Sequence, residues 1–504
     1  MHGKCSPASI AILMILTSGI IPAGVAIGQH APVDSGSASS SLTQDKAPEA
    51  QAAPEAVPKK APKYFTLRYN EDWSYLEGSA DSYEPDFFDA IKNINLGGDW
   101  RLDLGGSIRF RGMSETNKRY GAGRTSQDTF LLQQYLVHAN LRYRDVFRFF
   151  IEGIHAQVDE RQTPALGIDE NLHDIHQVFV DFKPFGSGTP LTVRVGRQEL
   201  LFGKQRLVSP LGWSNTRRKW DGISLLWKEG DWIAQGFYTR PVPVNRAEAL
   251  DRKLDEFNED QHFFGLYSTY KGWDKHVLDL YYLVLLDHRP RPNSAGFSDN
   301  MTLHTFGARW GGKTGPWDYD MEGAMQLGHH GGDPIFAWML AMEGGYTFVD
   351  VPMTPRVAVG FDWATGDKDP RDNQHNTFNH LFPLGHAYLG YLDQVGRQNV
   401  LDPNIALSFK PCKPVKLAIA YHHYFLDKNE DALYNAGGAP IRRDVRGQSG
   451  STIGGEMDVT LAWKVDRHQS VLFGWSHLWP GSFIDQTGDN DEVDLIYLQY
   501  VFKF

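Results

Sequence analysis

The chain has 504 residues, of which 13% are aromatic, 22% are charged and 50 are glycine. This composition is too aromatic for a disordered chain and too polar for a bundle of membrane helices. Beyond the first 25 residues no run of about 18 apolar residues occurs, so a membrane-spanning region would have to be built from strands. The net charge of −11, without any basic run of five residues, disfavours nucleic-acid binding.

The N-terminus has the features of a secretory signal peptide over residues 1–28. Lys4 precedes the apolar run 10–16, and small residues follow before position 28. Residues 29–63 are mainly Ala, Pro, Ser, Gln and Glu, which cannot bury enough apolar surface to offset the entropy of ordering. We therefore expect a flexible leader there, then an N-terminal segment over 64–98 and one domain over 99–504.

Apolar and polar residues alternate along the chain from Trp100 to the C-terminus, which is the pattern of strands. In the first such segment, Leu104 and Phe110 fall on one face, whereas Asp103 and Arg109 fall on the other. The pattern predicts about 18 strands, at 99–111, 130–144, 146–157, 174–183, 191–200, 221–228, 232–239, 262–270, 276–286, 302–311, 317–328, 335–349, 356–365, 403–410, 415–426, 454–465, 470–479 and 492–504.

The connections between these segments alternate between short turns and long polar loops, of which 240–261, 366–402 and 427–453 are the longest. This alternation is typical of outer-membrane barrels, which have tight periplasmic turns and larger external loops. The sequence therefore predicts an all-β protein, a transmembrane antiparallel β-barrel of about 18 strands with short periplasmic turns and long extracellular loops. The predicted location is the outer membrane of a Gram-negative bacterium, with segment 64–98 on the periplasmic side.

Two further features favour this fold. Tryptophans gather at the short-turn ends, where an interfacial aromatic girdle is expected, at positions 227, 232, 310, 317 and 463. The last strand places five apolar residues on one face and ends in Phe504. Such a strand is typical of proteins that the barrel-assembly machinery inserts, so we expect that machinery and membrane lipid as partners.

Several long strings in the expected order carry a family resemblance. They are LRYNEDWSYL (67–76), LGGSIRFR (104–111), VGRQEL (195–200), RLVSP with WSNTRR (206–210 and 213–218), and NTFN with LFP and YLD (376–379, 381–383 and 391–393). The chain resembles the alginate export family of outer-membrane channels, as a member of the broad family rather than as the alginate exporter itself. The resemblance implies an 18-stranded pore with an arginine-rich constriction for an anionic chain or solute.

The charged face of each strand should line the lumen, because Arg or Lys facing lipid near the midplane costs about 2–4 kcal/mol. An 18-stranded barrel is also too wide to be filled by wall side chains alone. The predicted lumenal residues are Arg101, Asp103, Arg109, Arg111, Arg142, Arg144, Arg148, Glu152, Asp181, Arg194, Arg197 and Arg309. Converging guanidinium groups attract carboxylates and phosphates, which predicts an anion-selective channel for an anionic polysaccharide or small organic anions. A general polar pore remains the alternative.

Two loops carry the remaining candidates. Loop 201–220 contains basic and indole side chains that would join the constriction if the loop folds inward, namely Lys204, Arg206, Trp213, Arg217, Arg218, Lys219 and Trp220. A solvated loop at the rim is the alternative. Loop 366–402 is rich in Phe and Tyr, so we expect it to pack against the interior or mouth as a lid, or to form an external cap.

No catalytic residue, cofactor or metal site is predicted. The acidic clusters 367–372 and 489–492 lack the ligand spacing of a calcium loop, and the pairs at 329–330 and 422–423 place their histidines on opposite faces of a strand. No hydrolase, zinc-protease or phosphate-loop motif occurs. We expect a channel, and we also expect periplasmic export proteins as partners. Two alternatives stay open, a barrel with enzymatic or adhesive loops and a soluble secreted enzyme. The sequence also leaves open the direction of transport and the oligomeric state.

Overall fold

The structure is a computed structural model that describes residues 64–78, 83–123, 126–245, 253–292, 298–369 and 371–504. The predicted signal peptide (1–28) and leader (29–63) lie outside the described residues. Within the described part, no helix is long and apolar enough to cross a membrane.

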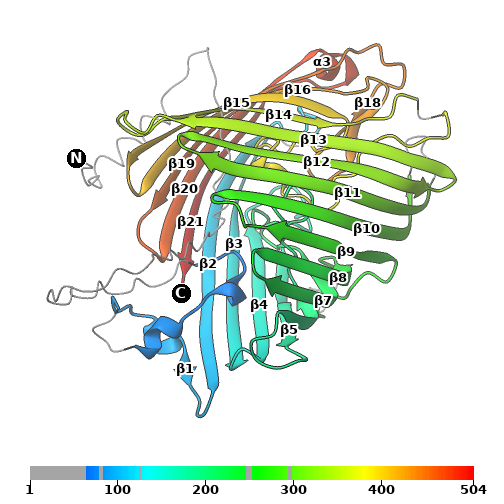
Figure 1. The fold of residues 1–504 in the computed structure, drawn as a ribbon. Coiled ribbons are helices and arrows are strands. Elements are labelled where there is room, and N and C mark those ends of the chain that lie inside the picture. Colours follow the sequence, from blue (N-terminus) through cyan, green and yellow to red (C-terminus); the bar gives the residue numbers. More distant parts are fainter. Residues whose placement is uncertain (1–63, 79–82, 124–125, 246–252, 293–297, 370) are drawn as a thin grey trace.

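Eighteen strands of the described chain form one closed antiparallel barrel (Figure 1). The first wall strand pairs with its successor on one side and with the last strand on the other, where Ser107 lies opposite Lys503. The wall strands are β2 (Trp100–Thr116), β3 (Gln127–Tyr143), β4 (Phe147–Asp159), β5 (Asn171–Phe182), β6 (Leu191–Gln198), β7 (Lys219–Glu229), β8 (Trp232–Val242), β9 (Gln261–Tyr270), β10 (His276–Pro292), β11 (Ser298–Thr314), β12 (Trp317–His330), β13 (Asp333–Thr347), β14 (Arg356–Ala364), β15 (Val400–Cys412), β16 (Val415–Phe425), β19 (Thr452–Lys464), β20 (Gln469–Pro480) and β21 (Val493–Lys503).

The predicted barrel and strand number are confirmed, and each predicted segment overlaps one wall strand. The strand ends on the loop side are where the prediction fell short, since β2 continues to Thr116 and β10 to Pro292. Polar side chains occupy both faces there: Ser114 and Thr129 share a hydrogen bond of 3.0 Å at an exposed position. Where both faces meet water, the alternation that marks a strand disappears. One loop-side connection is also short, because only residues 331–332 separate β12 from β13.

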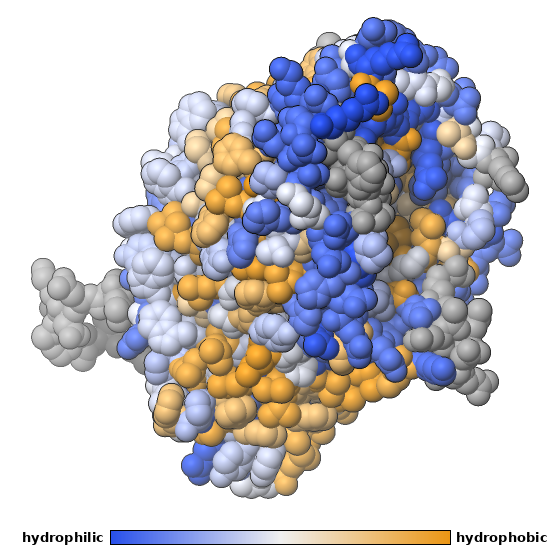
Figure 2. Space-filling view, turned by 90° about the vertical axis from the view of Figure 1, so that its right-hand side faces the viewer, coloured by the Kyte–Doolittle hydropathy of each residue, from blue (hydrophilic) through white to orange (hydrophobic). Residues whose placement is uncertain are grey.

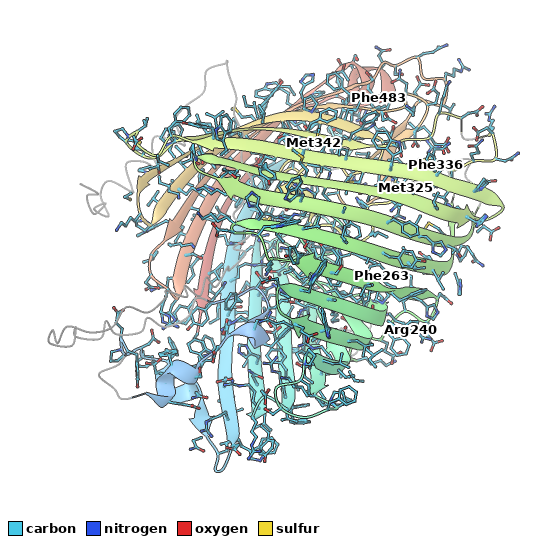
Figure 3. All side chains as sticks on the ribbon, in the orientation of Figure 1. Arg240, Phe263, Met325, Phe336, Met342 and Phe483 are labelled. Carbon is cyan, nitrogen blue, oxygen red and sulfur yellow. The ribbon has the colours of Figure 1, made fainter. Side chains whose placement is uncertain are left out.

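The two faces of the wall differ in polarity as predicted. On β2, Asp103 and Arg111 are buried at 1% and 2% exposure, whereas Leu104 on the opposite face is 36% exposed. Met325 and Phe336, labelled in Figure 3, are exposed apolar residues of the outward face of β12 and β13. Tryptophans 310 and 317 are 50% and 60% exposed at the short-turn end, where the sequence predicts the interfacial girdle.

The segment 64–95 lies at the end of the barrel where the short turns and the C-terminus are found (Figure 1). Its described residues, 64–78 and 83–95, contain three single turns of 3-10 helix, η1 (Arg68–Asn70), η2 (Ser74–Glu77) and η4 (Asp89–Ile91), and the two-residue strand β1 (Ile94–Asn95) pairs with β2. Tyr69 packs edge-on against the lumenal rings of Phe150 and Phe179 at 5.6 and 5.1 Å. The segment therefore covers part of the lumen from the short-turn side.

Three long loops fold into the barrel from the opposite end. Residues 199–218 and 365–399 join each other through a parallel bridge between Val208 and Phe382, and Phe382 packs on the inward ring of Phe263 at 5.0 Å. Residues 426–451 carry the small hairpin β17 (Ala432–Tyr434) and β18 (Pro440–Arg443), and Leu433 is fully buried. A short helix, α3 (Ser482–Thr487), precedes β21. Loops 201–220 and 366–402 thus both fold into the lumen. The alternatives, a solvated loop at the rim and an external cap, do not describe them.

Candidate functional site

Most of the predicted lumenal arginines are neutralised by carboxylates of the wall. Asp181 accepts hydrogen bonds from Arg194 at 2.7 Å and from Arg148 at 3.3 Å, and Arg309 contacts Asp279 at 2.7 Å. The other pairs are Arg142 with Asp103, Arg206 with Asp320 and Glu322, and Arg217 with Glu199. The predicted acid Glu152 is buried and accepts a hydrogen bond from Gln177 at 3.0 Å. These groups form a charged but largely compensated inner surface.

Three predicted residues lie away from the centre of the lumen. Arg101 is at the short-turn end and contacts Glu77 of the N-terminal segment at 3.1 Å. Arg144 lies in the turn between β3 and β4, where its exposed side chain pairs with Asp99. Arg197 shares the outward face of the wall with exposed Val195 and pairs with Asp221. The prediction that Arg144 and Arg197 line the lumen is therefore wrong. Arg144 lies in a turn that exposes its side chain to solvent, and Arg197 faces outward, where Asp221 compensates its charge.

Arg109 holds the loop 199–218 against the wall. Its guanidinium donates to the backbone oxygens of Gly212 and Ser214 at 2.8 and 2.7 Å, and to Oδ1 of Asn215 at 3.2 Å. Asn215 in turn donates through Nδ2 to three backbone oxygens, those of Gln133, Gln157 and Asp169. Arg109 therefore acts as an anchor for the loop.

Arg111, on the wall strand β2, is the wall-side member of a three-layer stack. Its guanidinium lies 3.5 Å from the ring centre of Trp213, and the other side of the stack is the imidazole of His386, 3.7 Å from Trp213 and nearly parallel to it. Two hydrogen bonds, of 2.9 and 2.7 Å, run from Arg111 to Oε1 of Gln499. The amide orients the guanidinium without neutralising its charge.

Arg218 carries a second uncompensated charge at the same place. It donates to the backbone oxygen of Pro383 at 2.7 Å, and burial lowers the pKa of its guanidinium to about 10. The side chain therefore remains protonated at neutral pH. Among the described residues, no carboxylate lies within ion-pair distance of Arg109, Arg111 or Arg218.

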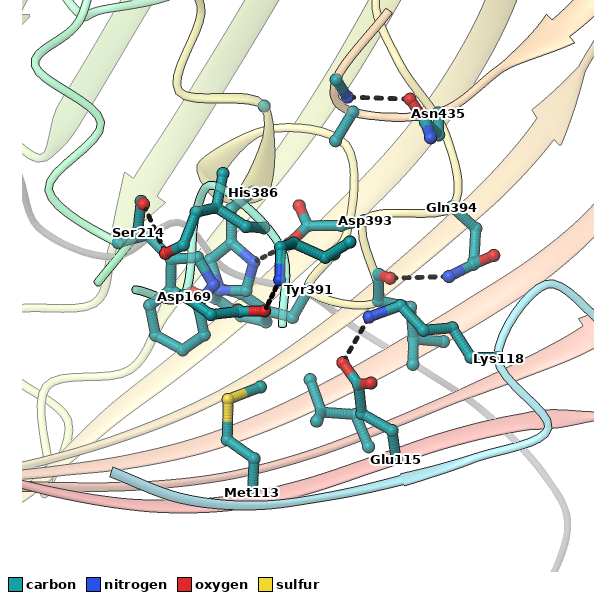
Figure 4. A pocket seen from close by; sticks show the side chains of 18 of the residues that line it. Met113, Glu115, Lys118, Asp169, Ser214, His386, Tyr391, Asp393, Gln394 and Asn435 are labelled. Carbon is teal, nitrogen blue, oxygen red and sulfur yellow. Dashed lines mark hydrogen bonds and ion pairs between the residues drawn. The ribbon is translucent and has the colours of Figure 1, made fainter. Parts of the chain in front are cut away.

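Arg111 and Arg218 line a cavity of about 390 Å³ between the inward loops (Figure 4). Trp213, His386 and Tyr391 supply its aromatic surface, and Nδ1 of His386 is 3.2 Å from a carboxylate oxygen of Asp393. Its lining is drawn from β2, β3, β21, from Lys118 and Arg119 after β2, and from the loops 160–170, 199–218, 365–399 and 426–451.

The opposite wall of this cavity compensates its own charge. Arg161 donates to Asp169 at 2.7 Å and lies 3.4 Å from Glu115, which also accepts from Lys118 at 2.6 Å. The Lys118–Glu115 contact is drawn in Figure 4. Arg111 and Arg218 therefore carry the buried uncompensated charge of the cavity, Arg111 against the indole of Trp213, and the exposed side chain of Arg119 also belongs to the lining.

The structure adds residues that sequence reasoning missed. His386, Asp393, Arg161 and Gln499 all take part in the cavity or its support. Gln499 meets Arg111 across 388 positions of sequence, so no local pattern could link them. For His386 and Asp393, the length and aromatic content of loop 366–402 were the signal in the sequence that this loop contributes to a site.

The acidic clusters and paired histidines behave as ordinary polar groups. Asp367, Asp369 and Asp372 each accept a hydrogen bond from a nearby backbone amide. His422 faces inward to Asp402 at 2.8 Å, whereas His423 bonds to Tyr421 on the outward face. In the part of the chain that the structure describes, no three histidine, cysteine or carboxylate side chains gather to hold a metal ion.

Comparison with known proteins identifies the family. Residues 100–497 match the sequence profile of the family described as alginate export. The chain belongs to the alginate export family. The member described here is an outer-membrane β-barrel channel, located in the outer membrane of a Gram-negative bacterium. A search of curated proteins finds no significant match.

Solved porin structures share the fold of this alginate export family member. The BenF-like porin of Pseudomonas fluorescens Pf-5 has a TM-score of 0.54 at 11% identity and covers 80% of this chain and 98% of its own. OpdQ of Pseudomonas aeruginosa has a TM-score of 0.52 at 11% identity, with 80% and 97% covered. The structure of Pseudomonas aeruginosa OpdK with vanillate has a TM-score of 0.51 at 10% identity, with 80% and 98% covered. At these identities the likeness concerns the fold alone.

Proposed function

We propose that this channel conducts a small organic anion that combines a carboxylate with a flat ring or a sugar face. The observation that carries the proposal is the stack of Arg111, Trp213 and His386 at the cavity, next to the charge of Arg218. A guanidinium offers a carboxylate paired hydrogen bonds, and an indole presents an apolar plane to a ring.

The distribution of charge supports anion preference. The wall arginines are matched by acids, so they contribute a polar surface rather than a net field. Arg111 and Arg218 keep their charge in a confined space, where electrostatic attraction is screened less than in bulk water. Carboxylates also line the cavity, those of Glu115, Asp169 and Asp393, and their repulsion favours release of an anion as well as entry.

The size of the cavity supports a small solute. Its volume of about 390 Å³ falls at the lower end of the range of pockets that hold small ligands, which is about 300–1,000 Å³. A uronate polymer is the second candidate, favoured by the family match. Its passage requires a continuous path along the lumen that is wide enough for a sugar chain, and the inward loops narrow that path.

Planar-bilayer recording tests the proposal. The reversal potential in a salt gradient should show anion preference, and benzoate-like carboxylates, vanillate among them, should block the current from millimolar concentrations. Arg111→Gln and Arg218→Gln should each reduce both effects, whereas Arg144→Gln, in an exposed turn, should leave them unchanged. Cation preference in the unaltered protein would refute the proposal. Block by uronate oligomers but not by aromatic carboxylates would favour the second candidate.

A further inference from the structure

A basic patch faces outward at the loop end of strands β6 to β10. We define the outer basic patch as Arg197, Arg240, His262 and His288. Arg240 lies opposite Asp221 across the β7–β8 pair, and Asp221 lies opposite Arg197 across β6–β7, so all three side chains share the outward face. Figure 3 labels Arg240 near the loop end of β8.

The patch lies immediately beyond the apolar band of the wall. Two positions closer to the middle of the strands, Val195, Ile223 and Tyr238 are 47%, 40% and 44% exposed on the same face. Two residues of a tilted strand rise about 5 Å, so the patch falls at the level where lipid tails meet headgroups. Tyr238 marks this level through its hydrogen bond of 2.6 Å to His262.

An apolar slot opens beside the patch. Its volume is about 300 Å³, and its walls are Ile175, Val178, Gly196 and Leu254, with Arg197 and Asp221 at its polar edge. Ile175 and Val178 belong to the outward face of β5, while Leu254 comes from the loop between β8 and β9 and is 46% exposed. The Arg197–Asp221 ion pair makes this edge polar but compensated, so the slot itself fits an apolar acyl chain and the charge for a headgroup must come from Arg240.

The charges of the patch are only partly compensated. Arg197 is fully engaged: it donates to Asp221 at 2.8 and 3.0 Å and to the backbone oxygens of Ile175 and Asp255 at 3.1 and 2.8 Å, and Asp174 lies 3.8 Å away. Arg240 has no carboxylate within ion-pair distance among the described residues, and its guanidinium lies 5.0 Å from the ring centre of Phe257. His262 and His288 lie with their rings 5.8 Å apart and present further nitrogen atoms, with Asp260 as the acidic neighbour of His262. Arg240 therefore supplies the uncompensated positive charge of the patch, in a chain whose net charge is −11.

We propose that the outer basic patch binds a phosphate of the acylated glycolipid of the outer leaflet, lipopolysaccharide, with one acyl chain against the slot. Guanidinium and imidazole groups are suitable donors to phosphate oxygens. The outward direction of the patch excludes a solute in the lumen, and the neighbouring apolar band brings the phosphate of a membrane lipid to the same height. This inference concerns the lipid side of the wall and does not depend on the transported solute.

Binding of purified lipopolysaccharide to the full-length protein, measured by native mass spectrometry from detergent, tests this inference. Arg240→Gln should weaken binding about fivefold, the effect expected for one basic group at a membrane surface, and Arg240→Gln with His262→Gln should weaken it further. Asp260→Asn should strengthen it. His423→Gln is the matched control, because His423 also pairs with an outward tyrosine but lies on β16, away from the patch. Heat-dependent gel mobility verifies that each variant is folded.

Two results would overturn the inference. The first is an affinity of the Arg240 variants for lipopolysaccharide that equals that of the unaltered protein, or a loss of affinity in His423→Gln as large as in Arg240→Gln. The second is equal binding of phosphatidylglycerol and lipopolysaccharide in competition from phosphatidylethanolamine vesicles, which would mean that any lipid phosphate suffices. Preference for lipopolysaccharide that disappears in the double variant supports it.

Discussion

The anchor between Arg109 and the loop 199–218 gives the most specific prediction. Replacing Arg109 with Met keeps the length of the side chain but removes three hydrogen bonds, those to Gly212, Ser214 and Asn215. Charge-assisted hydrogen bonds contribute about 1.5–3 kcal/mol each, and breaking a buried charged contact costs about 3–5 kcal/mol in practice. With a loss of about 3 kcal/mol, the ratio of released to seated loop rises about 150-fold.

Single-channel recording measures this change directly. Arg109→Met should show a larger mean conductance and frequent current transitions, because the loop no longer remains against the wall. The exposed turn variant Arg144→Met controls for the loss of a guanidinium as such. If the folded Arg109→Met protein conducts with the amplitude and noise of the unaltered channel, Arg109 does not hold the loop and the reasoning fails.

Three further predictions concern the cavity, the pH dependence and the N-terminal segment. Trp213→Ala should weaken block by aromatic carboxylates about tenfold, and block by chloride-sized anions should not change, because only a ring uses the indole face. Burial, reinforced by Arg218 and Arg397, lowers the pKa of His380 to about 3, so a released loop binds more protons below about pH 6.5 than the seated loop. Loop seating is therefore complete above that pH and weakens as the pH falls towards 3, which should appear as acid-induced conductance that is absent in His380→Gln. Arg68→Ala should lower the urea midpoint of unfolding by an amount equivalent to about 2–4 kcal/mol, whereas Arg101→Ala, at an exposed ion pair, should change it by less than about 1 kcal/mol.

The barrel could be predicted from the sequence because successive residues of a membrane-spanning strand face lipid and lumen in turn, so apolar and polar side chains must alternate. Arg109 and Phe110 are neighbours that must face opposite solvents, and eighteen repetitions of that pattern determine the sheet. The same rule places Asp103 and Arg111 in the lumen.

The arrangement inside the lumen could not be predicted in this way. Arg109 meets Gly212 across 103 positions, and these partners are joined by the path of an irregular loop that has no period. Arg197 shows a second limit, since near the loop end of the wall a charged residue can face outward once Asp221 is beside it. Alternation is therefore informative only within the thickness of the hydrocarbon layer.

The contacts of Arg68 have a consequence for the order of events during biogenesis. This side chain donates to the backbone oxygens of Gly106, in the first wall strand, and of Phe504, the final residue, at 2.8 Å each. The two acceptors come together only where the two margins of the sheet meet, so both hydrogen bonds of Arg68 can form only on the closed barrel. We therefore expect docking of the N-terminal segment to follow closure of the barrel during assembly.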